Sequence, residues 1–397
     1  MNSPSQTLPV SVQQGNIWRL AIAQALAGAN AIVIFATAAI LGSMLAPLPV
    51  LATLPVTIFV VGMAACIWPM GVLARYYGRK AAFMAGTLCG TLAGLIAVLA
   101  VMQTSFWLLC LSTFLGGAYA AVVLSFRFAA ADGVAPERKA RALSLVMAGG
   151  VAAGVIGPQL VTFTMNLWPG HTFAGTFLIQ ALVAMLSALV LAGVQLPATP
   201  APVAGQTAAG RPLSEVIRQP LFLTAVICGA VAYTVMNFVM TAAPLAMHFC
   251  GYPQSSSNLG IQWHVIAMYA PSFFTGRLIE RWGAMPVSMA GLLLTLGSIG
   301  VGLMGIEIMH FWAMLVLLGV GWNFGFLGAS ALVLQCHSAE EKNRVQSLND
   351  FIIFGLMAIG SLSSGGVLTA WGWNAVLWAS LAPLLLAVLV LLRVRKG

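Results

Sequence analysis

Methionine and histidine side chains with helical spacing are the groups in this sequence best suited to bind a ligand. Met236 and Met240 are four residues apart, and so are His264 and Met268. This spacing places both members of a pair on one face of a helix. Thioether and imidazole groups are soft ligands that favour Cu(I) over hard ions such as Mg²⁺. The four residues therefore predict a site for a soft metal ion.

Three more soft donors follow Met240 on the same segment, namely Met247, His248 and Cys250. Met247 lies about three helical turns beyond Met236, which returns it to nearly the same stripe of the helix. We interpret these three residues as a relay that would collect an ion at the outer mouth of the protein.

Packing in an apolar core is the alternative explanation for these spacings. Methionine commonly fills gaps in cores, and the chain contains 19 of them. Met285 and Met289 repeat the first spacing, and His310 and Met314 repeat the second. Spacing alone therefore does not distinguish a metal site from packing in the core. The location of the two pairs, at the middle of neighbouring apolar segments, favours a site.

Carboxylates are missing from the middle of the apolar segments. Glu307 falls at the expected outer face, and the other acidic residues fall at or near the expected inner face. A carboxylate proton relay is therefore not expected. The sequence also lacks an HExxH motif and a nucleophile elbow. We predict no enzyme activity, no catalytic residue and no cofactor, with a metal ion present only as transported substrate.

The composition indicates a membrane protein. Hydrophobic residues make up 60% of the 397 residues and charged residues 6%, whereas soluble domains carry roughly 25% charged residues. A membrane-spanning helix needs about 20 apolar residues. Runs of this kind lie near 17–42, 49–73, 81–102, 106–130, 141–166, 172–196, 220–248, 258–279, 284–306, 311–335, 345–369 and 374–394. The sequence therefore predicts an all-α membrane protein with twelve transmembrane helices.

A segment rich in Pro, Ala and Gly divides these runs into two sets. We predict an N-terminal six-helix half over 1–196, a cytoplasmic linker over 197–218 and a C-terminal six-helix half over 219–397. If the N-terminus is cytoplasmic, all 17 Lys and Arg residues fall on the inner side, as the positive-inside rule requires. The net charge of +9 is then a topology signal. Both termini are expected in the cytoplasm, with membrane lipid and no nucleic acid as partner.

Two loops repeat one glycine-rich pattern, one in each predicted half. The residues of the pattern are Gly71, Arg75, Gly78 and Arg79 in the first loop, and Gly276, Glu280, Arg281 and Gly283 in the second. Both loops resemble the loop motif of the major facilitator superfamily, although Arg75 stands where that motif has an acid. The resemblance implies the major facilitator fold, with two parallel halves of six helices, and loops that latch the cytoplasmic side.

Arg75 suggests a swapped version of that latch. Asp350 lies near the cytoplasmic start of the eleventh predicted span. We hypothesise that Arg75 pairs with Asp350. The alternative is two independently solvated charges, because isolated surface pairs are weak.

The second half resembles a narrower group, the CcoA-type copper importers and their riboflavin-transporting relatives. The resemblance is densest over 236–247, 263–276, 319–324 and 345–351. It implies that the copper ligands are Met236, Met240, His264 and Met268. It further implies copper import across the bacterial inner membrane by alternating access, which would supply the assembly of copper-containing oxidase. We expect a monomer.

Two alternatives to copper import stay open. The riboflavin-transporting relatives can share these Met and His pairs, and Trp263, Tyr269 and Trp322 could stack against a flavin ring. A carrier of riboflavin, or of another small molecule, is therefore the main alternative. A membrane sensor without transport activity is the third hypothesis. It is disfavoured because the sequence offers no soluble domain through which a sensor would signal.

Overall fold

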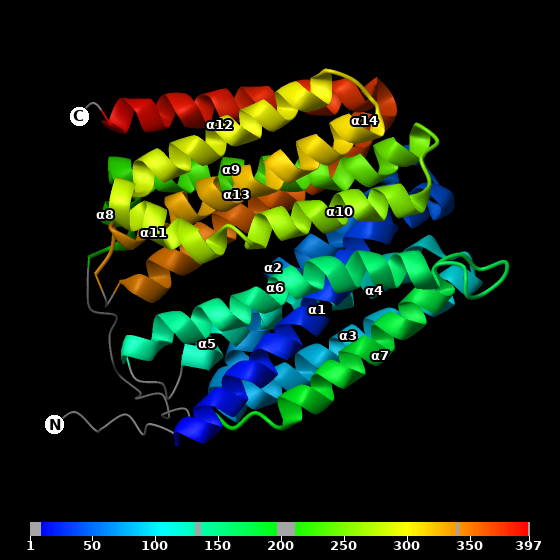
Figure 1. Cartoon of the computed structure of the whole chain (residues 1–397), viewed down its shortest axis with the longest axis horizontal. Helices are drawn as coiled ribbons and strands as arrows, with labels where there is room; N and C mark the ends of the chain where they lie inside the picture. Colours follow the sequence, from blue (N-terminus) through cyan, green and yellow to red (C-terminus); the bar gives the residue numbers. More distant parts are fainter. Residues whose placement is uncertain (1–8, 132–135, 197–210, 339–340, 396–397) are drawn as a thin grey trace. The chain divides into compact units, whose positions relative to one another are not determined.

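The computed structural model describes residues 9–131, 136–196, 211–338 and 341–395, and every regular element within these ranges is helical (Figure 1). The all-α fold class is therefore confirmed. The helices form two compact units, one of residues 1–47 with 58–202 and the other of residues 48–57 with 203–397. Most of the predicted linker lies outside the described residues. The proposed boundaries at 196 and 219 therefore stay a prediction.

The first unit contains seven of the described helices. They are α1 (Val10–Leu45), α2 (Leu54–Tyr77), whose first residues belong to the second unit, α3 (Arg79–Met102), α4 (Phe106–Val123), α5 (Phe126–Ala131), α6 (Pro136–Thr164) and α7 (Ala174–Ala192). α1 packs mainly against α6, and α3 packs against α4 and α7. Phe83, Tyr119 and Phe126 lie in a core cluster of this unit, and all three are buried. Apolar side chains thus fill the space between the helices.

Polar side chains join three helix termini at one end of this unit. The Lys80 amine donates to the carbonyl of Ala192 in the last turn of α7. The Asn16 side chain donates to the Gln195 carbonyl and accepts from the Gln195 backbone N–H. A cation near the C-terminus of a helix is favoured by the helix dipole. The start of α3 and the first turns of α1 therefore lie at the same end as the end of α7.

The second unit contains the remaining elements. They are η1 (Pro49–Leu51), α8 (Leu213–Ile217), α9 (Pro220–Phe249), α10 (Gln254–Tyr269), α11 (Ser272–Trp282), α12 (Ala284–Leu303), α13 (Ile308–Leu334) and α14 (Lys342–Arg395). α13 lies at the centre of the packing, because α9, α10 and α12 all pack against it. α14 packs mainly against α9. Residues on α13 are therefore placed to join several helices.

Ten of the described helices are long and apolar enough to cross a membrane by themselves. α14 counts once among them, although Gly372 interrupts it with a φ of 81° and divides it into two helices. Figure 1 shows these as separate orange and red parts. α10 and α11 together form the predicted eighth span, which is too short in either piece alone. With these two adjustments the twelve predicted spans are accounted for.

The two glycine loops have the same backbone conformation. Gly78 has φ 85° and ψ 157° before α3, and Gly283 has φ 88° and ψ 162° before α12. This region is essentially restricted to glycine, because a Cβ would clash there. Gly71 and Gly276 differ from them, since they lie within α2 and α11 without a positive φ, and a Cβ added at either would meet no atom within 4 Å. Only the second glycine of each loop is therefore required by the backbone.

Candidate functional site

A proline interrupts the eighth span of the protein at its middle. α10 ends at Tyr269 and α11 begins at Ser272, with Pro271 between them. Proline has no N–H, and its ring crowds the carbonyl four residues earlier, so the helical bonding pattern is broken there. The predicted span over 258–279 is thus built from two consecutive helices, α10 and α11. Carbonyl groups before the proline consequently need partners from another element.

Asn323 on α13 supplies those partners. Its amide Nδ2 donates to the Met268 carbonyl at 2.6 Å and to the Ser272 hydroxyl at 2.7 Å. Its amide Oδ1 accepts from the Thr275 hydroxyl at 2.7 Å. Asn323 is fully buried. One side chain of α13 therefore holds both sides of the interruption.

A second polar contact joins α10 to α13, nearer the start of both helices. The Nδ1 atom of His264 lies 2.6 Å from the Leu315 carbonyl oxygen. The helices approach closely here, because a Cβ at Gly319 would lie 2.6 Å from the His264 carbonyl oxygen. His264 is fully buried, and its Nε2 atom has no hydrogen-bond partner. The imidazole is thus fixed in position by its Nδ1 atom, while its Nε2 atom is available for another hydrogen bond.

An aromatic cluster surrounds Trp322, the residue before Asn323. The Trp322 ring stacks on Phe326 at 5.4 Å with an interplanar angle of 11°. Tyr233 of α9 meets it edge-on at 5.3 Å, and Tyr269 of α10 does so at 6.3 Å. Phe354 of α14 contacts Tyr233 at 5.8 Å. Four helices therefore contribute rings to one cluster, beside the proline interruption.

The predicted metal ligands are all buried in this unit. Met236 is 3% exposed, Met240 5%, Met268 7% and His264 0%. Nowhere in the described part of the chain do three His, Cys, Asp or Glu side chains gather in a way that could hold a metal ion. A copper ion here would depend on methionine sulfur atoms. The four-residue ligand set stays a prediction.

The predicted outer relay is divided between the interior and the surface. Met247 is 1% exposed, while His248 and Cys250 are exposed at the end of α9. His248 packs against the neighbouring ring of Phe249 at 6.3 Å. The structure therefore buries the first member and exposes the other two, and their role as a relay stays a prediction.

The predicted latch residues lie at the ends of their helices. Glu280 and Arg281 are exposed in the last turn of α11, and Arg79 opens α3. Asp350 lies in the first turns of α14, where its Oδ1 accepts a bond from the Asn349 amide at 3.1 Å. The side chain of Arg75 is outside the described residues. The proposed pairing of Arg75 with Asp350 therefore stays a prediction.

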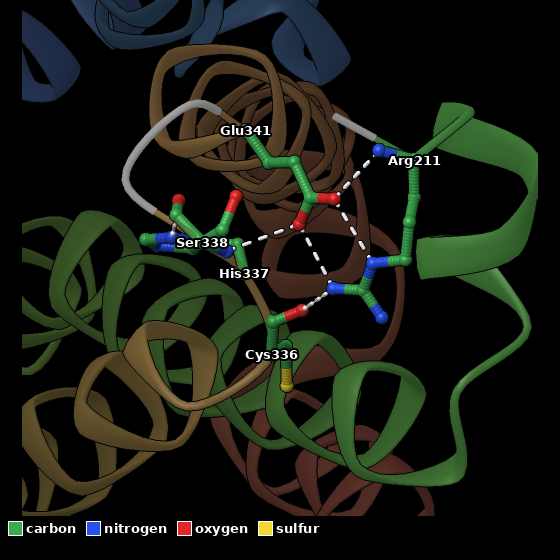
Figure 2. Close-up of polar contacts among 5 residues, drawn as sticks. All are labelled: Arg211, Cys336, His337, Ser338 and Glu341. Carbon is green, nitrogen blue, oxygen red and sulfur yellow. Dashed lines mark hydrogen bonds and ion pairs between the residues drawn. The ribbon is translucent and has the colours of Figure 1, made fainter. Parts of the chain in front are cut away.

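An ion pair that the sequence did not predict joins the partly exposed Arg211 to the buried Glu341 (Figure 2). The Arg211 guanidinium donates from Nε to Oε1 at 2.9 Å and from Nη2 to Oε2 at 2.8 Å, and its backbone N–H donates to Oε1 at 2.8 Å. Nη2 also donates to the Cys336 carbonyl at 3.1 Å. The Ser338 backbone N–H donates to Oε2. These contacts join the segment before α8 to the loop between α13 and α14.

The environment of this pair favours the charged form of both groups. The Glu341 side chain is 2% exposed, and the Arg211 side chain is 46% exposed. Hydrogen bonds from Arg211, followed by the bond from Ser338, hold the pKa of the Glu341 carboxyl well below its ordinary value. The bond to Glu341 raises the pKa of Arg211. Sequence spacing gave no signal for this pair, because its members are 130 residues apart.

A cavity of about 270 Å³ lies between α9 and α14, away from the proline interruption. Thr234, Ser363 and Ser380 are the hydroxyl residues of its otherwise apolar wall. The hydroxyls of Ser363 and Ser380 donate to carbonyls of their own helix. This cavity offers little polar recognition, so the aromatic cluster around Trp322 is the better candidate site.

Comparisons with known proteins agree with this architecture. Residues 20–355 match the model of the Major Facilitator Superfamily. The chain is 43% identical to the riboflavin transporter RfnT of Brucella anthropi, over 96% of this chain and 95% of that protein. It is 28% identical to the uncharacterized MFS-type transporter YdeG of Bacillus subtilis, over 92% and 88% respectively.

A solved structure extends the likeness to three dimensions. The crystal structure of a bacterial homologue of the iron transporter ferroportin, in an outward-facing state, matches with a TM-score of 0.64. The match covers 97% of this chain and all of that chain at 16% identity, so it bears on the fold alone. The family match, the near-complete coverage of its relatives and the apolar helices agree. The chain belongs to the Major Facilitator Superfamily and is a multi-pass membrane transporter.

Proposed function

We propose that this protein imports riboflavin across the bacterial inner membrane by alternating access. The observation that carries the proposal is the 43% identity to a riboflavin transporter over nearly the whole of both chains. The main hypothesis from the sequence, copper import, receives no support from these relatives. The alternative hypothesis of a riboflavin carrier is therefore favoured.

The chemistry of the second unit suits a flavin. Riboflavin is uncharged at neutral pH and carries a broad, flat ring system. The cluster of Tyr233, Tyr269 and Trp322 offers aromatic surfaces of the kind that contact flat rings. In the described ranges, acidic side chains lie in connecting segments or near helix ends. A neutral substrate needs no buried counter-charge, which would be costly inside a membrane.

Growth and uptake measurements test this proposal together. A riboflavin auxotroph that lacks its own carrier should grow on low riboflavin when it expresses this protein, and its cells should accumulate radiolabelled riboflavin. Expression of a transport-dead variant provides the background. If labelled copper accumulates and riboflavin does not, the proposed substrate is wrong, and the Met and His set becomes the first site to mutate.

The orientation of the protein follows from its basic residues and forms part of the proposal. We place both termini in the cytoplasm, because Lys and Arg are retained on that side of the membrane. A fluorescent protein fused after Gly397 should then fold and fluoresce, whereas alkaline phosphatase fused there should be inactive. The opposite pair of results would show that the C-terminus lies outside the cytoplasm and that the proposed orientation is wrong.

A further inference from the structure

Three buried polar atoms near the Trp322 cluster have no hydrogen-bond partner. They are the amide Nδ2 of Asn237 on α9, the imidazole Nε2 of His264 on α10 and the indole Nε1 of Trp322 on α13. The three residues are 2%, 0% and 7% exposed. Buried polar groups in proteins are nearly always paired, so each unpaired atom calls for an explanation. Hydroxyls such as Thr241 on α9 need none, since they can rotate toward a carbonyl of their own helix.

The hydrogen-bonding role of each atom follows from its chemistry. The Asn237 amide nitrogen and the Trp322 indole nitrogen are donors. The Leu315 carbonyl can only accept, so His264 must carry its hydrogen on Nδ1 to make the 2.6 Å contact. Burial disfavours a charged ring with a second hydrogen. The Nε2 atom of His264 is therefore an acceptor, and the three atoms are two donors and one acceptor.

The three residues lie at similar depth in the second unit. The turn after α9 and the turn before α13 are at the same level, because the Tyr252 hydroxyl donates to the Ile306 carbonyl at 3.2 Å. At 1.5 Å of rise per residue from that level, His264 lies about 15 Å deep, Asn237 about 18 Å and Trp322 about 21 Å. This range is comparable to the size of one small ligand. Along the helix axes the three residues therefore lie within about 6 Å of one another.

A flavin has the complementary pattern on one edge of its ring. The pyrimidine edge presents a carbonyl oxygen, an imide N–H and a second carbonyl oxygen, in the order acceptor, donor, acceptor. On the basis of the proposed riboflavin transport, we propose that this edge binds here. Asn237 and Trp322 donate to the two carbonyl oxygens, and His264 accepts from the imide N–H.

The surrounding contacts support this assignment. Tyr233 is one helical turn from Asn237 on α9 and lies 5.3 Å from the Trp322 ring, so the two donors adjoin one aromatic residue. Tyr269 contacts the same Trp322 ring from the other helix. Aromatic side chains thus lie beside the polar atoms that would bind the ring edge. Recognition then depends on the edge chemistry of the substrate as well as on its flat shape.

Flavin analogues test the role of His264 directly. Riboflavin methylated at the imide nitrogen cannot donate there, and wild type should take it up roughly tenfold less efficiently than riboflavin, because an unpaired buried acceptor is left behind. Riboflavin lacking one methyl group at the opposite, benzenoid end should be transported normally. In the variant His264→Phe the preference for riboflavin over the imide-methylated analogue should fall to within about twofold, because the acceptor is gone.

Two tryptophan variants test the donor side and form a matched pair. Trp322→Phe keeps an aromatic ring but removes the unpaired N–H, so the KM for riboflavin should rise roughly tenfold with the maximal rate retained. Trp312→Phe removes an N–H that already donates to the Ser256 carbonyl at 3.0 Å, and the KM should not change. Asn237→Leu should behave like Trp322→Phe.

The outcomes separate this proposal from the proposed function. If wild type takes up no riboflavin, the proposed function itself fails. If wild type takes up riboflavin and its imide-methylated analogue equally well, the function stands and the edge contact is wrong. If His264→Phe fails to reach the membrane, two measurements still test the proposal. They are the uptake ratio of riboflavin to its imide-methylated analogue in wild type, and the comparison of Trp322→Phe with Trp312→Phe. Equal KM values for wild type and Trp322→Phe would overturn the donor assignment.

Discussion

Replacing Asn323 by leucine should weaken the second unit of the protein more than any single loss of a local hydrogen bond. Leucine has a similar size but neither donates nor accepts. The change removes the bonds to the Met268 carbonyl, the Ser272 hydroxyl and the Thr275 hydroxyl at once. The Thr275 hydroxyl keeps its contact with the Pro271 carbonyl at 2.8 Å. The Met268 carbonyl is left without its partner from α13, beside a proline that prevents normal helical pairing.

The magnitude follows from the number and setting of these bonds. Side-chain hydrogen bonds between membrane helices contribute about 0.6 kcal/mol each on average. Three of them therefore contribute about 2 kcal/mol. The unpaired Met268 carbonyl adds a cost within the range of about 1–3 kcal/mol for a buried polar group. We expect Asn323→Leu to destabilise the protein by about 3–5 kcal/mol.

Unfolding of the purified protein in mixed detergent measures this effect. Thr295→Val is the matched control, because the buried Thr295 hydroxyl bonds only to the Gly291 carbonyl of its own helix at 3.0 Å. The control should lose about 0.6 kcal/mol, because it gives up a single side-chain hydrogen bond. If Asn323→Leu unfolds at the same detergent fraction as Thr295→Val, Asn323 does not hold the interruption together and the reasoning fails.

Three further predictions concern the loops. Gly283→Ala should lower the stability of the protein by about 1–3 kcal/mol, because φ is 88° there. Gly276→Ala should be neutral or slightly stabilising, because the added Cβ lies in open space. Equal melting temperatures for the two variants would contradict the strain argument. Because Arg211 holds the folded-state pKa of Glu341 below its unfolded value of about 4.3, the pair stabilises the protein fully above that pH and progressively less as the pH falls below it. The melting temperature of wild type should therefore drop between pH 5 and pH 3 more steeply than that of Glu341→Gln, and parallel curves would refute the linkage. If Arg75 pairs with Asp350, Arg75→Glu and Asp350→Arg should each slow riboflavin uptake, and the double variant should restore the uptake rate. If the double variant stays slow, the two charges act independently.

The fold was largely predictable from the sequence, because apolar runs and basic residues reflect the bilayer directly. Segments long enough to span a membrane and the repeated glycine loops depend on local composition, which is visible in one chain. Pro271 was visible too, yet its consequence was not, since proline-containing membrane helices often continue with little change. Only the position of Asn323 on α13 shows how the interruption is compensated.

The candidate site was harder to predict, because its residues become neighbours only after folding. Trp322 and Tyr233 meet across 89 positions of sequence, and Arg211 and Glu341 are farther apart still. Met236 and Met240 share a helix face in either a metal site or an apolar core, so their spacing could not decide the substrate. The unpaired nitrogen of His264 is likewise compatible with a metal or a hydrogen-bond donor. The choice of riboflavin required the likeness to a known transporter.

The contacts of Asn323 have a mechanical consequence for the transporter. The Asn323 amide bonds to Met268 before the proline and to Thr275 after it. α13 therefore restricts bending at Pro271, where the eighth span would otherwise be free to flex. α10, α11 and α13 should then move as one rigid body, and Tyr269 and Trp322 should keep their relative positions while they do so. The bending needed for alternating access must therefore occur elsewhere, so a substrate bound at the rings would be carried by a surface that does not change shape.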